Sequence, residues 1–258
     1  MRISLIQMNV AEDKSENLSH AEELILKAAG SDVIMLPEMF CCPYESASFI
    51  KNAEEEGGPV TKMLSEAARR ANAYIIGGSM PEADCGRIYN TCFVYAPDGS
   101  RAARHRKAHM FDINVEGGQS FRESDTLSAG DSMTRFSTPW GVFGVCVCFD
   151  IRFHKFISEA EGMDYLAVPA AFNMTTGPLH WELLFRARAV DEQAFTFGCA
   201  PARNEHGSYV SYANSIAVSP WGRVIARSGT GEEIITLEID PSEVRSARRQ
   251  IPIGKQEV

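Results

Sequence analysis

No part of this sequence is apolar for long enough to cross a membrane. Its apolar runs fall well short of the roughly 18 to 20 residues that a helix needs to span the hydrocarbon core. Low-complexity tracts are also missing, while hydrophobic residues make up 45% and charged residues 23% of the 258 residues. This composition is typical of a globular protein. We therefore expect neither a disordered chain nor an association with the membrane.

Positive charge is scarce as well. The chain has 25 Lys and Arg against 34 Asp and Glu, which gives a formal net charge of -9. Proteins that bind nucleic acid usually cluster an excess of Lys and Arg along the phosphate backbone. We expect no nucleic-acid partner, and an anionic substrate would need a local positive site rather than a basic surface.

A secretory leader and a disulfide framework are not indicated either. The first residues, "MRISLIQMNV", alternate like a strand and lack the apolar core and cleavage site of a signal peptide. Seven cysteines, an odd number, favour reduced thiols and a cytoplasmic location. Cys146 and Cys148 have no second ligand pair at zinc spacing, and His105 and His109 have no Glu between them. We expect no metal site.

What the sequence does contain is an alternation of strand-like and helix-like segments. Residues 3–10 alternate like a strand, apolar residues in 18–28 recur at helical spacing, and 32–38 return to an apolar strand. A helix near 60–72 and a strand at 73–80 repeat the pattern. This interleaving predicts an α/β fold.

Turn signals later in the chain predict antiparallel strands in the same fold. Pro-Asp-Gly at 97–99 and Pro-Trp-Gly at 139–141 each lie between two extended runs. A buried strand at 164–172 precedes a helix expected at about 180–193. The apolar face of that helix is expected to comprise Leu183, Leu184, Ala187, Val190 and Ala194. No linker rich in Pro, Gly or Ser divides the chain, so we expect a single domain over 1–258.

Two cysteines stand at the end of the apolar run "VFGVCVCF". Polar residues follow Cys148, so it lies where a strand gives way to a turn or helix. Ligands of open α/β sheets usually bind at this end of a strand, and a helix N-terminus favours a thiolate. The segment alone leaves two possibilities for Cys148, a nucleophile or an inert buried thiol. Cys146, two residues earlier, is expected to belong to the core.

A cysteine nucleophile needs a base for its proton and a donor for the developing oxyanion. His180 and His154 lie near apolar segments, but no cysteine-protease signature surrounds the thiol. Glu38, at the end of the strand-like "DVIMLPEMF", and Lys107, in "RHRKAHMFDIN", offer a carboxylate and an ammonium instead. Taken singly, Glu38 is better explained as a surface cap and Lys107 as part of a solvated loop.

These three segments together resemble the nitrilase, or carbon-nitrogen hydrolase, superfamily. Its Glu, Lys and Cys match, in chain order, Glu38 in "LPEMF", Lys107 in "HRKAHMFDI" and Cys148 in "GVCVCFDIRF". The segments 121–132 and 171–195 are similar to the omega-amidase (Nit2-like) branch. Amidases that act on deaminated glutathione share much of the second segment, so a sibling amidase is the alternative, followed by a non-catalytic binding member of the fold.

The resemblance implies a nitrilase-like four-layer α-β-β-α sandwich, with two sheets face to face and helices outside. It implies that Glu38 is the general base and that the Cys148 thiol forms a thioester with a small-molecule amide. Lys107 and the backbone N–H of Phe149 would stabilise the oxyanion, and Glu123 lies where the family often carries an auxiliary glutamate. It also implies that no cofactor is needed and that the chain forms a homodimer.

The branch implies substrates that are dicarboxylic acid monoamides, such as 2-oxoglutaramate and 2-oxosuccinamate, so a carboxylate has to be bound. Arg152, four residues after Cys148, is expected to clamp it, because a guanidinium can bind a carboxylate through two hydrogen bonds. A surface ion pair is the alternative role for this arginine. The matching motifs place further pocket residues at Tyr44, Phe172, Met174, Thr175 and Thr176.

Overall fold

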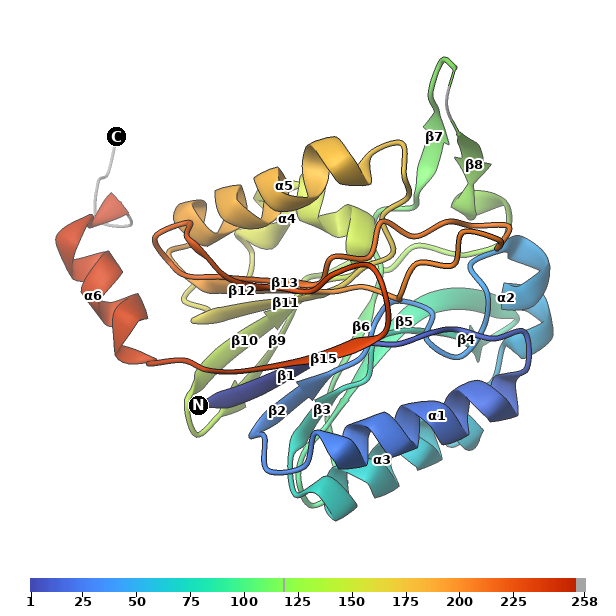
Figure 1. The fold of residues 1–258 in the computed structure, drawn as a ribbon, viewed down its shortest axis with the longest axis horizontal. Helices are drawn as coiled ribbons and strands as arrows, with labels where there is room; N and C mark the ends of the chain where they lie inside the picture. Colours follow the sequence, from blue (N-terminus) through green and yellow to red (C-terminus); the bar gives the residue numbers. More distant parts are fainter. Residues whose placement is uncertain (118, 254–258) are drawn as a thin grey trace.

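The computed structural model describes residues 1–117 and 119–253, so the last residues of the predicted domain, 254–258, lie outside the described part. In the described residues a seven-stranded and a six-stranded sheet pack face to face, and helices cover their outer faces (Figure 1). The predicted four-layer α-β-β-α sandwich is confirmed. None of the described helices is long and apolar enough to cross a membrane.

The seven-stranded sheet combines a parallel centre with antiparallel edges. Its central strands β1, β2 and β3 are parallel neighbours, and β15 and β5 pair antiparallel on either side. The predicted turn at 97–99 joins β5 to β6, as expected. The strands are β1 (Arg2–Gln7), β2 (Val33–Met35), β3 (Tyr74–Ile76), β4 (Met80–Asp84), β5 (Arg87–Tyr95), β6 (Arg101–Arg106) and β15 (Glu233–Glu238).

Two long helices cover the outer face of this sheet (Figure 1). Helix α1 (Lys14–Lys27) begins at Asp13, whose side chain accepts a hydrogen bond from the N–H of Glu16. Helix α3 (Pro59–Ala71) begins with a proline and ends at Asn72 in the left-handed conformation. The short α2 (Ser46–Asn52) lies at the end of the sandwich.

The six-stranded sheet has a similar plan. Its parallel strands β10, β11 and β12 lie between antiparallel neighbours, and the predicted turn at 139–141 joins β9 to β10. Its strands are β9 (Thr134–Thr138), β10 (Gly141–Val145), β11 (Tyr165–Pro169), β12 (Phe195–Cys199), β13 (Ile216–Val218) and β14 (Val224–Arg227). Helices α4 (His154–Ile157) and α5 (Gly177–Asp191) cover its outer face (Figure 1).

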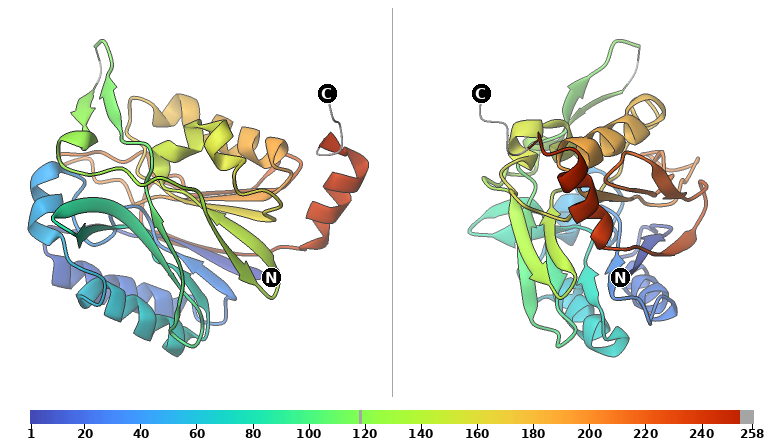
Figure 2. Two further views of the ribbon diagram at one scale, coloured as in Figure 1. Left: turned by 180° about the vertical axis from the view of Figure 1, so that it is seen from behind. Right: turned by 90° about the vertical axis from the view of Figure 1, so that its left-hand side faces the viewer.

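The remaining elements lie at the two ends of the sandwich (Figure 2). A hairpin of β7 (Asp112–Asn114) and β8 (Ser120–Arg122) projects at one end, and α6 (Ser242–Gln250) lies at the other. The short 3₁₀ helices η1 (Glu123–Asp125) and η2 (Cys148–Arg152) follow β8 and β10.

The apolar face predicted for α5 was wrong at several positions. Leu183 is 63% and Val190 50% exposed, and the residues buried against the sheet include Trp181 and Phe185. Ala194 is buried but lies beyond the end of the helix. Because α5 carries apolar residues on several sides, its periodicity does not select one face, and the larger aromatic rings take the buried positions.

The core between the two sheets is formed by side chains from both of them. Ile3 and Val33 from the first sheet belong to the same buried cluster as Phe143 and Tyr165 from the second. Cys146, the residue after β10, is fully buried in this cluster, as expected. All seven cysteines, each within the described residues, are free.

The carboxyl ends of the parallel strands in both sheets supply the loops that carry the candidate residues. Glu38 follows β2, Cys148 follows β10, and Ala171 follows β11. Lys107 comes directly after β6, an antiparallel strand of the first sheet. Two sheets packed face to face therefore bring residues distant in sequence to one buried position.

Candidate active site

Lys107 lies at the centre of the site, fully buried between two carboxylates. Its Nζ is 3.0 Å from Glu38 Oε1, 3.0 Å from Glu123 Oε1 and 2.8 Å from Glu123 Oε2. Burial lowers the pKa of Lys107, but the charges of Glu123 and Glu38 outweigh it and raise the pKa above its ordinary value. The lysine is therefore a fixed ammonium at neutral pH.

Neutral side chains complete the shell around this ion group. Tyr44 donates its hydroxyl toward Glu123 Oε1 at 3.2 Å and lies 3.3 Å from Lys107 Nζ. The Nδ2 of Asn90 donates to Glu38 Oε1 at 2.8 Å and to Glu123 Oε1 at 3.2 Å. These bonds fix both carboxylates in place, so the group is rigid before any substrate binds.

Backbone donors hold the second oxygen of each glutamate. The N–H of Ala171, just after β11, donates to Glu38 Oε2 at 2.7 Å, and the N–H of Phe111 donates to Glu123 Oε2 at 2.7 Å. The Tyr209 hydroxyl in turn donates to the carbonyl of Ala171. The orientation of Glu38 is thus set by segments from both sheets.

Cys148 lies at the tight turn between β10 and the helix η2. Its backbone has φ of +48°, in the left-handed region that side chains other than glycine rarely adopt, and only 4% of the residue is exposed. Burial raises the pKa of the Cys148 thiol, the Glu38 charge raises it further, and the Lys107 charge lowers it less; the net pKa is well above its usual value. The resting group is a thiol that needs a base.

Arg152 lies at the other end of η2 and is half-buried. Its guanidinium carbon is 5.3 Å from the ring centroid of Phe149 and 5.1 Å from that of Phe172. Its Nη1 is 3.1 Å from His180 Nδ1, and its Nε has no hydrogen-bond partner among the described residues. A guanidinium held over two rings without a carboxylate partner in the described structure is suited to binding an anion.

The loop between β11 and α5 carries the remaining predicted pocket residues. Phe172 is buried and packs against Trp181 with ring centroids 5.1 Å apart. Met174 is 40% exposed, Thr175 is half-buried, and the hydroxyl of Thr176 donates to Asn173 Oδ1. The structure therefore brings Phe172 to Arg152, whereas Met174, Thr175 and Thr176 lie along the adjoining turn.

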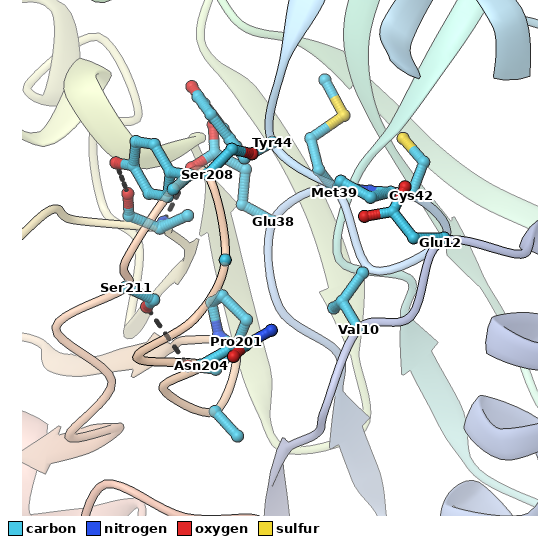
Figure 3. Close-up of a pocket in the computed structure, with 15 residues that line it drawn as sticks. Val10, Glu12, Glu38, Met39, Cys42, Tyr44, Pro201, Asn204, Ser208 and Ser211 are labelled. Atoms are coloured by element: carbon cyan, nitrogen blue, oxygen red, sulfur yellow. Dashed lines mark hydrogen bonds between the residues drawn. The ribbon is translucent and has the colours of Figure 1, made fainter.

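A cavity of about 70 Å³ approaches Glu38 from the side of the 201–211 loop. Figure 3 shows Glu38 and Tyr44 on one wall and Met39 with Cys42 on another. Cys42 is buried, and so is its neighbour Cys41. The cavity connects the buried carboxylate with the loops at the surface.

Several residues of the site had not been predicted from sequence. Asn90 is an isolated amide in the apolar strand β5, and this was a signal that it has a buried polar partner. Tyr209 and Ala171 gave no such signal, because one lies in a loop rich in turn residues and the other contributes only its backbone. His180, considered as a possible base, instead contacts Arg152.

Comparisons with known proteins agree with this geometry. The family model described as "Carbon-nitrogen hydrolase" matches residues 2–249. The chain is 48% identical to omega-amidase NIT2-A of Xenopus laevis and 45% identical to human omega-amidase NIT2, in each case over 99% of this chain and 94% of the relative. The crystal structure of Saccharomyces cerevisiae Nit3, a member of branch 10 of the nitrilase superfamily, aligns with a TM-score of 0.91 and 38% identity, over 99% of this chain and 96% of Nit3. The chain is an enzyme that belongs to the carbon-nitrogen hydrolase family.

Proposed function

We propose that the protein is an omega-amidase that hydrolyses the terminal carboxamide of small dicarboxylic acid monoamides, such as 2-oxoglutaramate and 2-oxosuccinamate, to the acid and ammonia. The observation that carries this proposal is the buried Lys107 ammonium between Glu38 and Glu123, beside the Cys148 turn. The names of the relatives that cover nearly the whole chain support the substrate class.

In the first half of the reaction Cys148 attacks the carboxamide carbon. Glu38 takes the thiol proton as the carbon–sulfur bond forms, and the carbonyl oxygen becomes an oxyanion. Lys107 Nζ and the backbone N–H of Phe149, in the first turn of η2, stabilise this oxyanion. Glu38 then returns the proton to the amide nitrogen, the carbon–nitrogen bond breaks, and ammonia leaves a thioester on Cys148.

In the second half water hydrolyses the thioester. Glu38 takes a proton from the water as its oxygen attacks the thioester carbon, and Lys107 again stabilises the oxyanion. The carbon–sulfur bond breaks, the sulfur regains a proton from Glu38, and the carboxylic acid is released. Every step uses groups of the chain itself, and Glu123 keeps Lys107 oriented throughout.

The first test is substrate hydrolysis by the purified protein, followed as ammonia from 2-oxoglutaramate and as the released amine from deaminated glutathione. We expect kcat/KM for 2-oxoglutaramate to exceed that for deaminated glutathione, because the half-buried Arg152 matches a short substrate with a free carboxylate. A preference for the peptide-like amide would instead assign the sibling activity. If 2-oxoglutaramate released no ammonia and the peptide-like amide released no amine, amide hydrolysis would be contradicted and a binding role favoured.

The proposed role of Arg152 predicts a selective effect on substrate binding. Arg152→Ala should raise KM for the dicarboxylic monoamide by about 10- to 100-fold, since hydrogen bonds to charged groups contribute roughly 1.5–3 kcal/mol. KM for a neutral amide of similar length, measured on the same variant, should change little. Arg152→Lys, which keeps the charge but not the two-pronged geometry, should fall between the two. Equal increases for both substrates would remove Arg152 from this role.

We also propose a homodimer that pairs through α5. Leu183, Val190 and Trp221 are exposed around one surface hollow, and Val190 and Trp221 also border a second hollow that is lined by Ile251, next to the end of α6. Apolar patches of this kind usually mark contact surfaces. Leu183→Lys should shift the mass in solution, measured by light scattering, toward the monomer. Ile50→Lys on α2, equally exposed at 61%, is the control and should leave the mass unchanged; an unchanged mass for both would argue against this surface.

We place the enzyme in the cytoplasm, where free cysteines stay reduced. Its seven cysteines are free, and Cys85 is exposed on the surface. A fluorescent fusion that collects in a secretory compartment or an organelle would contradict this location.

A further inference from the structure

Asp150 is a buried carboxylate that the proposed reaction does not use, yet it accepts five hydrogen bonds. Its Oδ1 accepts from the backbone N–H groups of Ala108 and His109, at 3.1 and 2.9 Å, and from His109 Nδ1 at 2.8 Å. Its Oδ2 accepts from His105 Nε2 at 3.0 Å and from the N–H of Val147 at 3.1 Å. No exposed surface remains on this side chain.

These contacts determine the protonation states of Asp150 and of the two histidines. Burial raises the pKa of Asp150, but the hydrogen bonds from His105 and His109 lower it to about 2, so the carboxylate is ionised and accepts every contact. His105 Nε2 and His109 Nδ1 must then carry protons. The His109 ring also stacks on Phe153 with centroids 3.6 Å apart, which fixes its orientation.

The five donors come from the two segments that carry the reacting groups. His105, Ala108 and His109 flank Lys107 on the strand β6 and the turn after it. Val147 immediately precedes Cys148, and Asp150 itself is two residues beyond Cys148 in η2. One carboxylate thus ties the backbone beside the ammonium to the backbone beside the thiol.

The backbone turn that Asp150 stabilises contains a residue in an unfavourable conformation. Cys148 has φ of +48°, and a residue in this region persists only where its surroundings impose it. The bond from the Val147 N–H to Asp150 Oδ2 closes the turn on one side of Cys148, and the Phe153 N–H donates to the Asp150 carbonyl on the other.

We propose that Asp150, with His105 and His109, is a positioning group that holds the Cys148 sulfur at the distance and angle needed for reaction beside Lys107. The inference rests on the proposed amidase function and assigns its nucleophile a second set of supporting residues. A displacement of about 1 Å between reacting groups can cost on the order of 100-fold in rate. A group that fixes two segments from opposite sheets therefore affects kcat without touching the substrate.

Asp150→Asn should selectively remove the hydrogen bond from Val147, the residue that precedes Cys148. The asparagine oxygen can still accept from the N–H groups of Ala108 and His109, while its NH₂ faces His105 and Val147. His105 can respond by moving its proton to Nδ1, which then donates to Thr134 Oγ1, 3.2 Å away, because the Thr134 hydroxyl can donate to the Arg104 carbonyl. The backbone N–H of Val147 can only donate a hydrogen bond, so it loses its acceptor.

A second aspartate provides a matched control. Asp164 accepts the N–H of Val142 at 2.9 Å, at the end of β10 opposite to Cys148, and pairs with Arg248. Asp164→Asn should lower the melting temperature but leave kcat within about twofold, because it loosens the strand without reaching the Cys148 turn.

The experiment measures kcat and KM for 2-oxoglutaramate, the melting temperature, and the rate at which iodoacetamide alkylates Cys148, followed by peptide mass. For folded Asp150→Asn we expect kcat to fall about 100-fold with KM changed less than about threefold, and alkylation of Cys148 to slow by at least about tenfold. A kcat within about threefold of the wild type, or an equal loss in Asp164→Asn, would overturn the proposal.

His109→Phe keeps the inference testable if Asp150→Asn does not fold. The phenyl ring retains the stacking on Phe153 and the backbone N–H retains its bond to Asp150, so this partly exposed position should tolerate the change. We expect kcat and Cys148 alkylation to fall together by about 5- to 10-fold, consistent with the loss of one hydrogen bond to a charged group; unchanged values for both would overturn it. Alkylation needs no amide substrate, so a wild-type enzyme without amidase activity would contradict the proposed function and still leave this inference testable.

Discussion

Cys148→Ala is expected to abolish ammonia release, with kcat lower by about 10⁴-fold or more, the scale at which nucleophile removal acts in other enzymes with covalent intermediates. Without the sulfur, no thioester can form, and direct attack by water would have to do without covalent catalysis. Substrate binding should persist, because Arg152 and the Lys107 group remain in place. Ammonia release and substrate binding by calorimetry, measured on the same sample, check both parts.

Cys146→Ala is the matched control for this substitution. Cys146 lies two residues earlier and is fully buried in the core between the sheets. Removing its sulfur should cost about 1 kcal/mol of stability and leave kcat within about twofold, since only packing changes. Retained ammonia release in Cys148→Ala, or equal losses in the two variants, would show that the nucleophile lies elsewhere.

Lys107→Met should have the second largest effect and act on rate and stability together. It removes an oxyanion donor, a change that costs on the order of 10²- to 10³-fold in kcat in other enzymes. It also leaves Glu38 and Glu123 buried without their cation, and breaking a buried ion pair in this way costs about 3–5 kcal/mol. Steady-state kinetics and chemical denaturation measure the two effects separately.

The stability loss of Lys107→Met should depend on pH in a defined direction. The folded-state pKa of Lys107 is raised, so its contribution in the wild type is complete below the ordinary lysine pKa of about 10.4 and is lost only above it. The difference in unfolding free energy between the two proteins should therefore be fully present between about pH 7 and 10 and should narrow as the pH rises above that range.

Lys14→Met is the control for charge removal. Lys14, the first residue of α1, pairs with Glu54 at a partly exposed position. Such pairs contribute about 0–1 kcal/mol, so kcat should not change and stability should change little. A stability loss in Lys107→Met no larger than that in Lys14→Met would contradict a buried, fully paired lysine.

Local sequence patterns predicted the α/β fold and the hairpin turns, whereas the four-layer sandwich was predicted from the resemblance to the family. Strand alternation and turn residues such as those at 97–99 and 139–141 act over a few neighbours, and the structure confirms both hairpins. The exposed face of α5 could not be predicted in the same way. Leu183 and Val190 are as apolar as typical core residues. Trp181 and Phe185 are buried instead because their side of the helix packs against the second sheet.

Part of the candidate site could also be predicted from the sequence. Glu38 and Cys148 each follow an apolar strand, and the resemblance to the family connected them to Lys107. The contacts of Asp150 were not predictable from spacing, because its partners His105 and His109 are more than 40 residues away and meet it only when the two sheets pack. Long-range pairing of this kind is a property of the tertiary structure.

The proposed reaction passes through a thioester on Cys148, and rapid acid quench during turnover can trap this intermediate. Wild-type enzyme is mixed with 2-oxoglutaramate and quenched within milliseconds, and the mass of the peptide that contains Cys148 is measured by mass spectrometry. We predict an increase equal to the mass of the substrate minus ammonia, on Cys148 and not on Cys146. Ammonia release accompanied by an unmodified Cys148 at every quench time, or by an adduct on another residue, would show that the reaction does not pass through a thioester on Cys148.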